Sequence, residues 1–203
     1  MNPKARVDKI SLINFRNHKN THIKNLNSFV VLNGNNGSGK TSILEAISYF
    51  SPGRGLKNSS HSEIINKSEN RCELNINLKY DTGNIELKRH FSSLSKKDNY
   101  ISVDDEKISN SQLLDFINIL WITPVMEKVM LQSNSEKRNF FDRLIFNINR
   151  THLKNYSSLQ KLFYERLALL KKTKTDYDWL RILEDKIAHL SANLLDNRNI
   201  FIS

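Results

Sequence analysis

Residues 29–47 have the sequence Phe-Val-Val-Leu-Asn-Gly-Asn-Asn-Gly-Ser-Gly-Lys-Thr-Ser-Ile-Leu-Glu-Ala-Ile. Within this stretch, residues 34–41 fit the pattern G-x-x-x-x-G-K-[ST] in full. The continuous apolar run 29–32 predicts a buried strand before the pattern. Apolar residues at helical spacing predict a helix over 41–50 after it. A glycine-rich loop between a strand and a helix indicates a phosphate-binding loop in an α/β fold.

The residue types of this loop suit a nucleotide phosphate. Glycines allow the backbone to wrap an anion without Cβ clashes, and successive N–H groups then point inward at the positive end of the following helix. The ammonium of Lys40 can reach the β- and γ-phosphates, and the hydroxyl of Thr41 can ligate Mg²⁺. We therefore expect ATP and Mg²⁺ as cofactors. The predicted nucleotide-binding residues of the loop are Gly34, Asn35, Asn36, Gly37, Ser38, Gly39, Lys40 and Thr41.

Composition narrows the function classes. The 203 residues include 31 Lys and Arg, 21 Asp and Glu, and a single cysteine. One cysteine excludes an intrachain disulfide, and a reducing, cytoplasmic location is the default expectation. A spanning helix is not expected because there is no run of about 18 apolar residues. Residues 1–60 hold nine Lys and Arg but only two acids, which favours a polyanion partner, although a lysine-rich genome would give the same excess.

The sequence pattern divides the chain into two lobes. Alternating apolar residues predict a strand over 7–14 and antiparallel strands between about 71 and 108, with Cys72 as a buried strand residue. From residue 135 onward the apolar spacing is helical. We expect a mixed sheet in an ATP-binding lobe, residues 1–125, and an incomplete helical lobe, residues 126–203.

Other candidate sites have simpler explanations. The only near match to a magnesium-binding strand end includes Asp104 and Asp105, and its short apolar stretch favours an acidic hairpin turn. Asp142 lies in a predicted helix, and we expect a solvated or salt-bridged surface carboxylate there. His18 and His22 lie in a predicted strand or turn, where residues four apart are not neighbours, so a zinc site is not expected.

Several segments in order resemble bacterial RecF, an SMC-like ABC ATPase. The resemblance covers at least residues 7–170, and its segments are 10–17, 32–47, 51–54, 121–124 and 137–144. It implies an ABC-type ATPase of recombinational DNA repair, replication restart and the SOS response. It also implies binding to gapped or double-stranded DNA without sequence preference, ATP-dependent homodimerisation, and RecO and RecR as partner proteins.

The resemblance also implies roles for four residues outside the loop. Arg16 and Asn17 would lie near the γ-phosphate and base of the nucleotide. Arg54 and Lys57 would contact DNA, and Arg54 could also lie near the phosphates.

Some family features are not found in this sequence. They are the ABC signature segment, the Walker B aspartate and the catalytic glutamate. Val125 stands where relatives have glutamine, and Lys137 replaces the first of two arginines. The chain therefore resembles an N-terminal RecF half, for which we expect nucleotide binding without efficient hydrolysis. We also expect uncovered apolar surface and a marginal or self-associating chain.

Two alternative functions stay open from the sequence. One is a P-loop kinase or GTPase acting on a small molecule, although no Asn-Lys-x-Asp motif for guanine is found. The other is a non-functional truncated remnant that binds nucleotide weakly.

Overall fold

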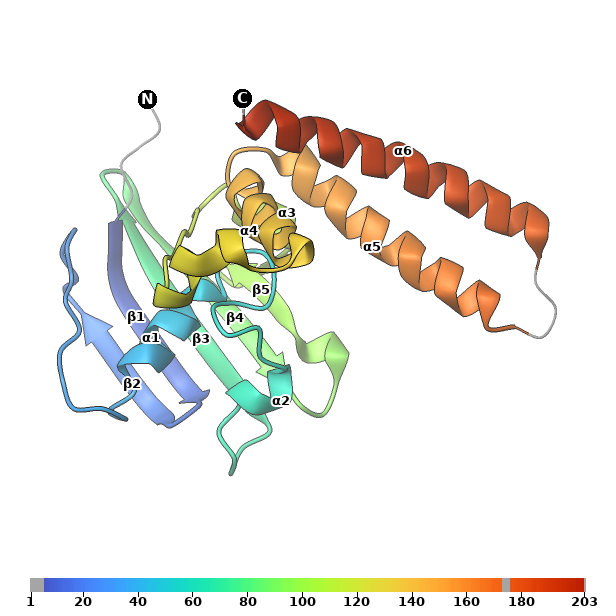
Figure 1. Ribbon diagram of the computed structural model, residues 1–203. Coiled ribbons are helices and arrows are strands. Elements are labelled where there is room, and N and C mark those ends of the chain that lie inside the picture. The colour runs from blue at the N-terminus through green and yellow to red at the C-terminus, as the bar shows by residue number, and fades with distance from the viewer. Residues whose placement is uncertain (1–5, 173–175, 203) are drawn as a thin grey trace. The chain divides into compact units, whose positions relative to one another are not determined.

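The computed structural model describes residues 6–172 and 176–202 (Figure 1). The chain divides into two compact units, Met1–Trp121 and Ile122–Ser203. This division lies close to the boundary that the sequence pattern predicts after residue 125.

The first unit is built on one six-stranded sheet. Its spatial order is β2-β1-β3-β4-β5-β6, and every neighbouring pair is antiparallel. The predicted strands over 7–14 and 71–108 are therefore confirmed, whereas the expectation of a mixed sheet is wrong for the part that the structure describes. The strand bounds are β1 Arg6–Phe15, β2 His18–Lys24, β3 Arg71–Tyr80, β4 Gly83–Ser92, β5 Tyr100–Val103 and β6 Glu106–Ile108.

One face of this sheet carries the core of the unit. Alternating residues of β1, β3 and β4, such as Leu12, Leu74 and Leu87, are fully buried because the side chains of a strand point to opposite faces in turn. The helix that follows the phosphate loop, α1 Lys40–Ser48, packs against β1 (Figure 1). The shorter elements of the unit are α2 His61–Ile64, the 3₁₀ turn η1 Lys96–Asp98 and α3 Asn110–Leu113.

The apolar run before the phosphate loop is not a strand. Residues 29–32 form no ladder with the described strands, and the side chains of Phe29 and Val31 are 84% and 72% exposed. Val30 and Leu32 instead line an apolar cavity of about 430 Å³ with Ile43 of α1 and other residues. The predicted buried strand is therefore wrong here, because a central strand requires neighbours on both sides to pair its backbone.

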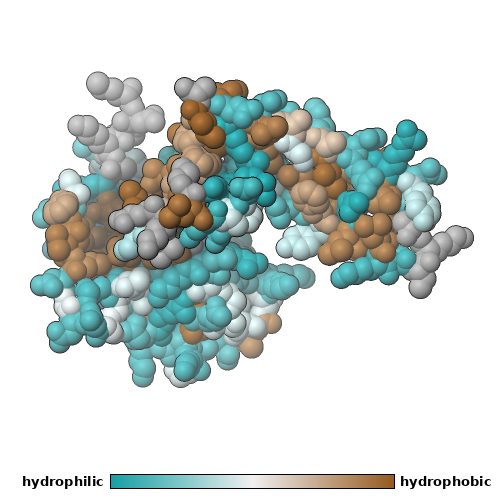
Figure 2. Space-filling view, in the orientation of Figure 1, coloured by the Kyte–Doolittle hydropathy of each residue, from teal (hydrophilic) through white to brown (hydrophobic). Residues whose placement is uncertain are grey.

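The second unit is helical, as the apolar spacing predicts. Long helices α5 and α6 lie side by side as an antiparallel pair (Figure 1). Figure 2 shows apolar surface, in brown, along this pair of helices. Exposed apolar residues of α5 and α6 include Phe163, Leu167 and Ile182. The element bounds are η2 Pro124–Leu131, α4 Asn134–Phe146, α5 Arg150–Leu170 and α6 Tyr177–Ile202. None of the described helices is both long and apolar enough to cross a membrane.

A buried ion pair joins the helices of this unit. Asp142 of α4 is 1% exposed and accepts hydrogen bonds from Arg198 Nε at 2.7 Å and Nη2 at 2.8 Å. His152 Nε2 of α5 lies 2.9 Å from the same carboxylate. The prediction of a salt-bridged Asp142 is confirmed, but its expected surface position is wrong. A charge at this depth is tolerated because two partners from other helices compensate it.

Candidate nucleotide site

The phosphate loop, residues 34–41, adopts backbone conformations that require glycine. Gly37 and Gly39 have φ angles of +83° and +95°, a region that other residues rarely enter. At Gly39 the space is also closed, because an added Cβ would lie 2.5 Å from His18 Nε2 and 3.2 Å from Asn17 Nδ2. The turn between β1 and β2 therefore supports the loop from one side.

Lys40 closes the loop from within. Its ammonium donates to the carbonyl oxygens of Gly34 at 2.6 Å and of Asn35 at 2.7 Å. Two further bonds shape the loop: Gly34 N–H donates to Asn33 Oδ1 at 2.8 Å, and Ser38 N–H donates to Asn35 O at 3.2 Å. Phosphate oxygens bind an ammonium more strongly than neutral carbonyls do. The lysine therefore lies where it can exchange these carbonyls for a phosphate.

The N-terminus of α1 is open toward the loop. Gly39 is its N-cap, and the structure shows no side chain capping this end among the described residues. The first N–H groups of a helix need partners and carry its positive dipole end, so they favour an anion. Thr41 lies in the first turn with its side chain exposed. Its hydroxyl is available to a metal ion that accompanies a phosphate.

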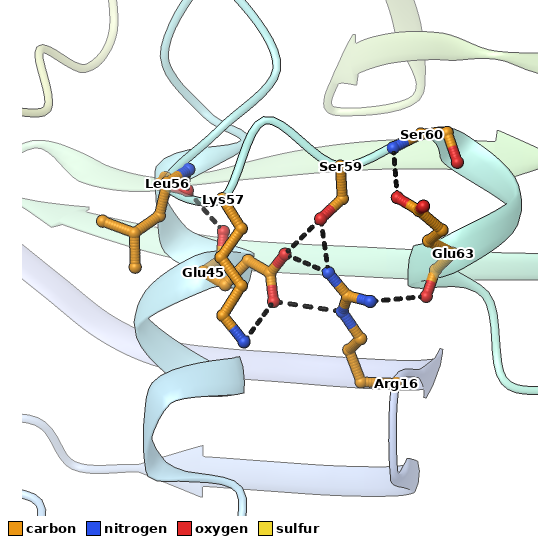
Figure 3. Close-up of polar contacts among 8 residues, drawn as sticks. Arg16, Glu45, Leu56, Lys57, Ser59, Ser60 and Glu63 are labelled. Atoms are coloured by element: carbon orange, nitrogen blue, oxygen red, sulfur yellow. Dashed lines mark hydrogen bonds and ion pairs between the residues drawn. The ribbon is translucent and has the colours of Figure 1, made fainter.

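Arg16 lies at the turn after β1 and reaches the side of α1 (Figure 3). Its guanidinium makes a two-point contact with Glu45, from Nε at 3.1 Å and Nη2 at 2.5 Å. Nη1 donates to the carbonyl oxygen of Glu63 at 2.7 Å. The hydrogen bonds to Glu45 raise the pKa of Arg16 further above its ordinary value. In this structure Arg16 therefore joins α1 to α2.

Asn17 and His18 lie against the phosphate loop itself. His18 Nε2 is 3.3 Å from the carbonyl oxygen of Gly39, and its Nδ1 is 2.9 Å from Thr21 Oγ1. Asn17 is among the residues predicted at the site, whereas His18 is a supporting residue that the sequence pattern did not reveal. Its position in the sequence, next to the predicted site residues Arg16 and Asn17, could have indicated this role.

Arg54 and Lys57 belong to the loop that follows α1, residues 53–60, which we call the basic loop. Both side chains are exposed. Lys57 Nζ lies 3.7 Å from Glu45 Oε2, so this lysine shares its carboxylate partner with Arg16. Glu45 was not among the residues predicted at the site, although a lone acid between apolar residues of a predicted helix is a usable signal.

The acidic residues at the β5–β6 turn have structural roles. Asp104 Oδ1 accepts a hydrogen bond from Glu86 N–H at 2.9 Å, and Asp105 Oδ1 accepts one from Lys88 Nζ at 2.7 Å. Both residues have positive φ angles, as a tight hairpin turn requires. The predicted acidic hairpin turn is therefore confirmed.

The histidine and cysteine candidates also have structural explanations. His22 is on β2, and its Nδ1 lies 2.9 Å from Ser11 Oγ. No group of three potential metal ligands occurs among the described residues. Cys72 is buried on β3, as predicted, and burial raises the pKa of its thiol to about 12.

Comparison with known proteins agrees with the loop geometry. A family model described as an AAA domain matches residues 9–199, which is most of the chain. The chain belongs to the AAA domain family. This AAA domain is 38% identical over 192 residues to the DNA replication and repair protein RecF of Rickettsia prowazekii, and 36% identical to that of Rickettsia felis. The matches cover 95% of the chain and 53% and 52% of these relatives, so the chain spans about half their length. The resemblance to RecF is thus confirmed.

Solved structures show the same fold as this AAA domain. The recombination mediator protein RecF of the RecFOR pathway, in structures with ATPrS and with ATP, superimposes with TM-scores of 0.86 and 0.85. The sequence identities are 23% and 24%, and each match covers 98% of this chain and 54% of the other. The expected ABC-ATPase-like lobe followed by helices is confirmed as the fold of RecF.

Proposed function

We propose that this chain is a RecF-like, ATP-binding and DNA-binding protein of recombinational DNA repair and replication restart. The observation that carries the proposal is the phosphate loop, with Lys40 turned into it and an uncapped helix N-terminus behind it. Membership of the AAA domain family and the RecF relatives support it. A kinase or GTPase acting on a small molecule has no comparable support in the described residues.

ATP is the proposed nucleotide, with Mg²⁺ bound through Thr41. Backbone N–H groups of residues 34–41 would hold the phosphates, and Lys40 would exchange its loop carbonyls for the β- and γ-phosphates. Asn17, beside Gly39, is well placed to contact the nucleotide. For Arg16 to approach the γ-phosphate, its guanidinium would have to leave Glu45 at least in part.

We further propose that this chain alone does not hydrolyse ATP efficiently. Turnover needs a carboxylate on the metal and a group that orients the attacking water. The strongest sequence candidates for the metal ligand are Asp104 and Asp105, and both accept hydrogen bonds within the β5–β6 hairpin. This hairpin forms one edge of the sheet, whereas β2 forms the other edge. Phosphate release should therefore stay near background. Robust release that Lys40→Ala abolishes would contradict this part of the proposal.

DNA is the proposed polyanion partner, bound through the basic loop. Arg54 and Lys57 are exposed there, in the same unit as the proposed nucleotide site, and Lys57 lies 3.7 Å from Glu45 of α1. Such contacts go to phosphates and not to bases, so binding would be sequence-independent and weaken with salt. Two phosphate contacts predict a slope of about −2 in a plot of log affinity against log salt concentration. A gapped duplex and an intact duplex are the probes.

Further proposals follow from the RecF resemblance. They are cooperation with RecO and RecR, ATP-dependent homodimerisation of the full-length relatives, and a cytoplasmic location. Nucleotide binding is the central step of the proposed function, and one experiment tests it directly. Titration with a fluorescent ATP analogue should give saturable binding, displaced by ATP and only weakly by GTP. Preferential displacement by GTP would favour the GTPase alternative instead.

A further inference from the structure

The carboxylate of Glu45 connects its own helix, α1, to the end of β1 and to the basic loop (Figure 3). Its side chain is 0% exposed. Arg16 reaches it from the end of β1, and Lys57 and Ser59 reach it from the basic loop, with Ser59 Oγ donating at 3.4 Å. A buried carboxylate is strongly destabilising unless cations and hydrogen bonds compensate it. The fold therefore holds these three partners in place around Glu45.

A second contact fixes the basic loop to the same helix one turn later. Ser48 Oγ donates to the carbonyl oxygen of Glu45 and accepts a hydrogen bond from Leu56 N–H, both at 2.6 Å. Gly55, with φ of +67°, approaches so closely that an added Cβ would lie 2.9 Å from Ser48 Oγ. The basic loop thus follows the surface of α1 over consecutive turns.

The other end of α1 is the phosphate loop. Lys40 is its first residue, and the helix is continuous from there to Ser48. A hydrogen bond of 3.1 Å from Ile43 N–H to Gly39 O joins the loop to the helix. Because a short helix moves as one body, a displacement at its N-terminus also displaces Glu45 and Ser48.

Backbone strain occurs in both segments that contact Glu45, the end of β1 and the basic loop. Arg16 and Asn58 have φ angles of +54° and +53°, which L-residues rarely adopt. Such conformations persist only where surrounding contacts hold them, and they are typical of functional sites and switches. Here the backbone of Arg16 is held directly: its N–H donates to Ile64 O at 2.7 Å, and its carbonyl oxygen accepts from Asn66 Nδ2 at 2.9 Å.

We propose that Glu45 is a positioning residue that transmits occupancy of the phosphate loop to the basic loop. The inference rests on the proposed function, because it requires a nucleotide at residues 34–41. When phosphate binding shifts α1, the Glu45 contacts to Arg16 and Lys57 change, and with them the accessibility of Arg54 and Lys57. The coupling is reciprocal: an anion that draws Lys57 away from Glu45 changes nucleotide affinity by the same factor.

Trypsin provides a local test, because it cleaves after arginine and lysine. The rate of cleavage after Arg54 and Lys57 is measured by mass spectrometry, with and without Mg-ATP. In the unaltered chain we expect Mg-ATP to change this rate by about fivefold or more, the usual range of coupling between sites. Glu45→Gln keeps the side-chain volume but removes the charge, and should abolish the change while retaining nucleotide binding. Glu69→Gln, the same substitution at an exposed position, is the matched control.

The outcomes distinguish failure of the coupling inference from failure of the proposed nucleotide-binding function. If Glu45→Gln retains the nucleotide-dependent change, or the unaltered chain binds nucleotide without showing one, the inference is wrong. If Glu45→Gln does not fold, Lys57→Gln replaces it, because Lys57 is half exposed and Arg54 still reports on the loop. Loss of the change in Lys57→Gln supports the inference, and its retention opposes it. Nucleotide binding that is indifferent to Lys40→Ala would instead refute the proposed function.

Discussion

The ammonium of Lys40 lies 2.6 Å from the carbonyl oxygen of Gly34, at the first residue of the phosphate loop. The chain between these two residues is thereby closed into a ring by one charged hydrogen bond. The loop holds its curved shape through its own contacts, and the same cation that holds it is the proposed phosphate ligand. Binding then requires an exchange of oxygen partners at Lys40.

Lys40→Ala should weaken nucleotide binding. A hydrogen bond to a charged group contributes roughly 1.5–3 kcal/mol, which corresponds to a loss of affinity of about ten- to a hundredfold. Titration with a fluorescent ATP analogue measures this change. Lys161→Ala removes an exposed lysine of α5 and serves as the control for net charge. Equal affinity of the Lys40 and Lys161 variants would refute the site.

Gly39→Ala should disturb both stability and nucleotide binding. The substitution combines an unfavourable φ of +95° with a Cβ placed 2.5 Å from His18 Nε2. Backbone strain of this kind costs about 1–3 kcal/mol, and the steric contact adds to it. Gly83→Ala is the control, because its Cβ would meet nothing within 4 Å and only the conformational cost remains. Urea unfolding should show the larger loss for Gly39→Ala, and a smaller or equal loss would contradict the close contact.

Asp142→Ala should destabilise the helical unit. The substitution leaves Arg198 without the carboxylate that neutralises it and His152 without its partner. Breaking a buried ion pair on one side costs about 3–5 kcal/mol. Urea unfolding followed by helical circular dichroism provides the measurement, with Asp185→Ala on the exposed side of α6 as control. The double variant Asp142→Leu with Arg198→Met should recover much of the loss, and no recovery would argue against the pair as its cause.

Cys72 should resist alkylation in the folded chain. Burial raises its pKa to about 12, from an ordinary value of 9.0. At pH 8 the folded thiol is therefore almost wholly protonated, and the thiolate is the reactive form. The raised pKa also determines how stability depends on pH. The unfolded chain loses this proton near pH 9 while the folded chain retains it, so stability falls as pH rises between 9 and 12. Iodoacetamide labelling at pH 8 should be slow until urea is added, and rapid labelling of the folded chain would contradict the burial.

Phe29 and Val31 should promote self-association. Both are highly exposed, and they alternate along the chain with Val30 and Leu32, which line the apolar cavity. Contiguous exposed apolar surface favours association. Light scattering across a concentration series should show a growing mass that the double variant Phe29→Ser with Val31→Ser reduces. Leu94→Ser, at an exposed apolar residue after β4, is the control. A monodisperse monomer with sharp, cooperative melting would contradict the prediction.

Local patterns in the sequence predict much of this fold. Alternation predicts the strands near 7–14 and 71–108, and the turn at Asp104 and Asp105 follows from its polar, acidic residues. Glycine spacing predicts the phosphate loop together with the helix after it. These features depend on residues close together in the chain, so a single sequence contains the information.

Features that depend on distant partners were not predictable in the same way. Glu45 is buried because Arg16, 29 residues away, compensates its charge. Asp142 is buried because Arg198, 56 residues away, does the same. The run 29–32 has the composition of a buried strand, yet composition cannot show whether neighbouring strands are present to pair with it. In each case tertiary context decides the outcome.

The pairing of β1 with β3 has a consequence for the order of folding. The two strands are neighbours in the sheet but distant in the sequence. The segment of chain between them contains the phosphate loop, α1 and the basic loop. Bringing such distant segments together costs entropy before any contact compensates it, so this pairing forms more slowly than the β3–β4 hairpin. The turn that supports Gly39 belongs instead to the local β1–β2 hairpin, which needs no such closure. During refolding, the hairpin that supports the phosphate loop is therefore expected to form before the central sheet is complete.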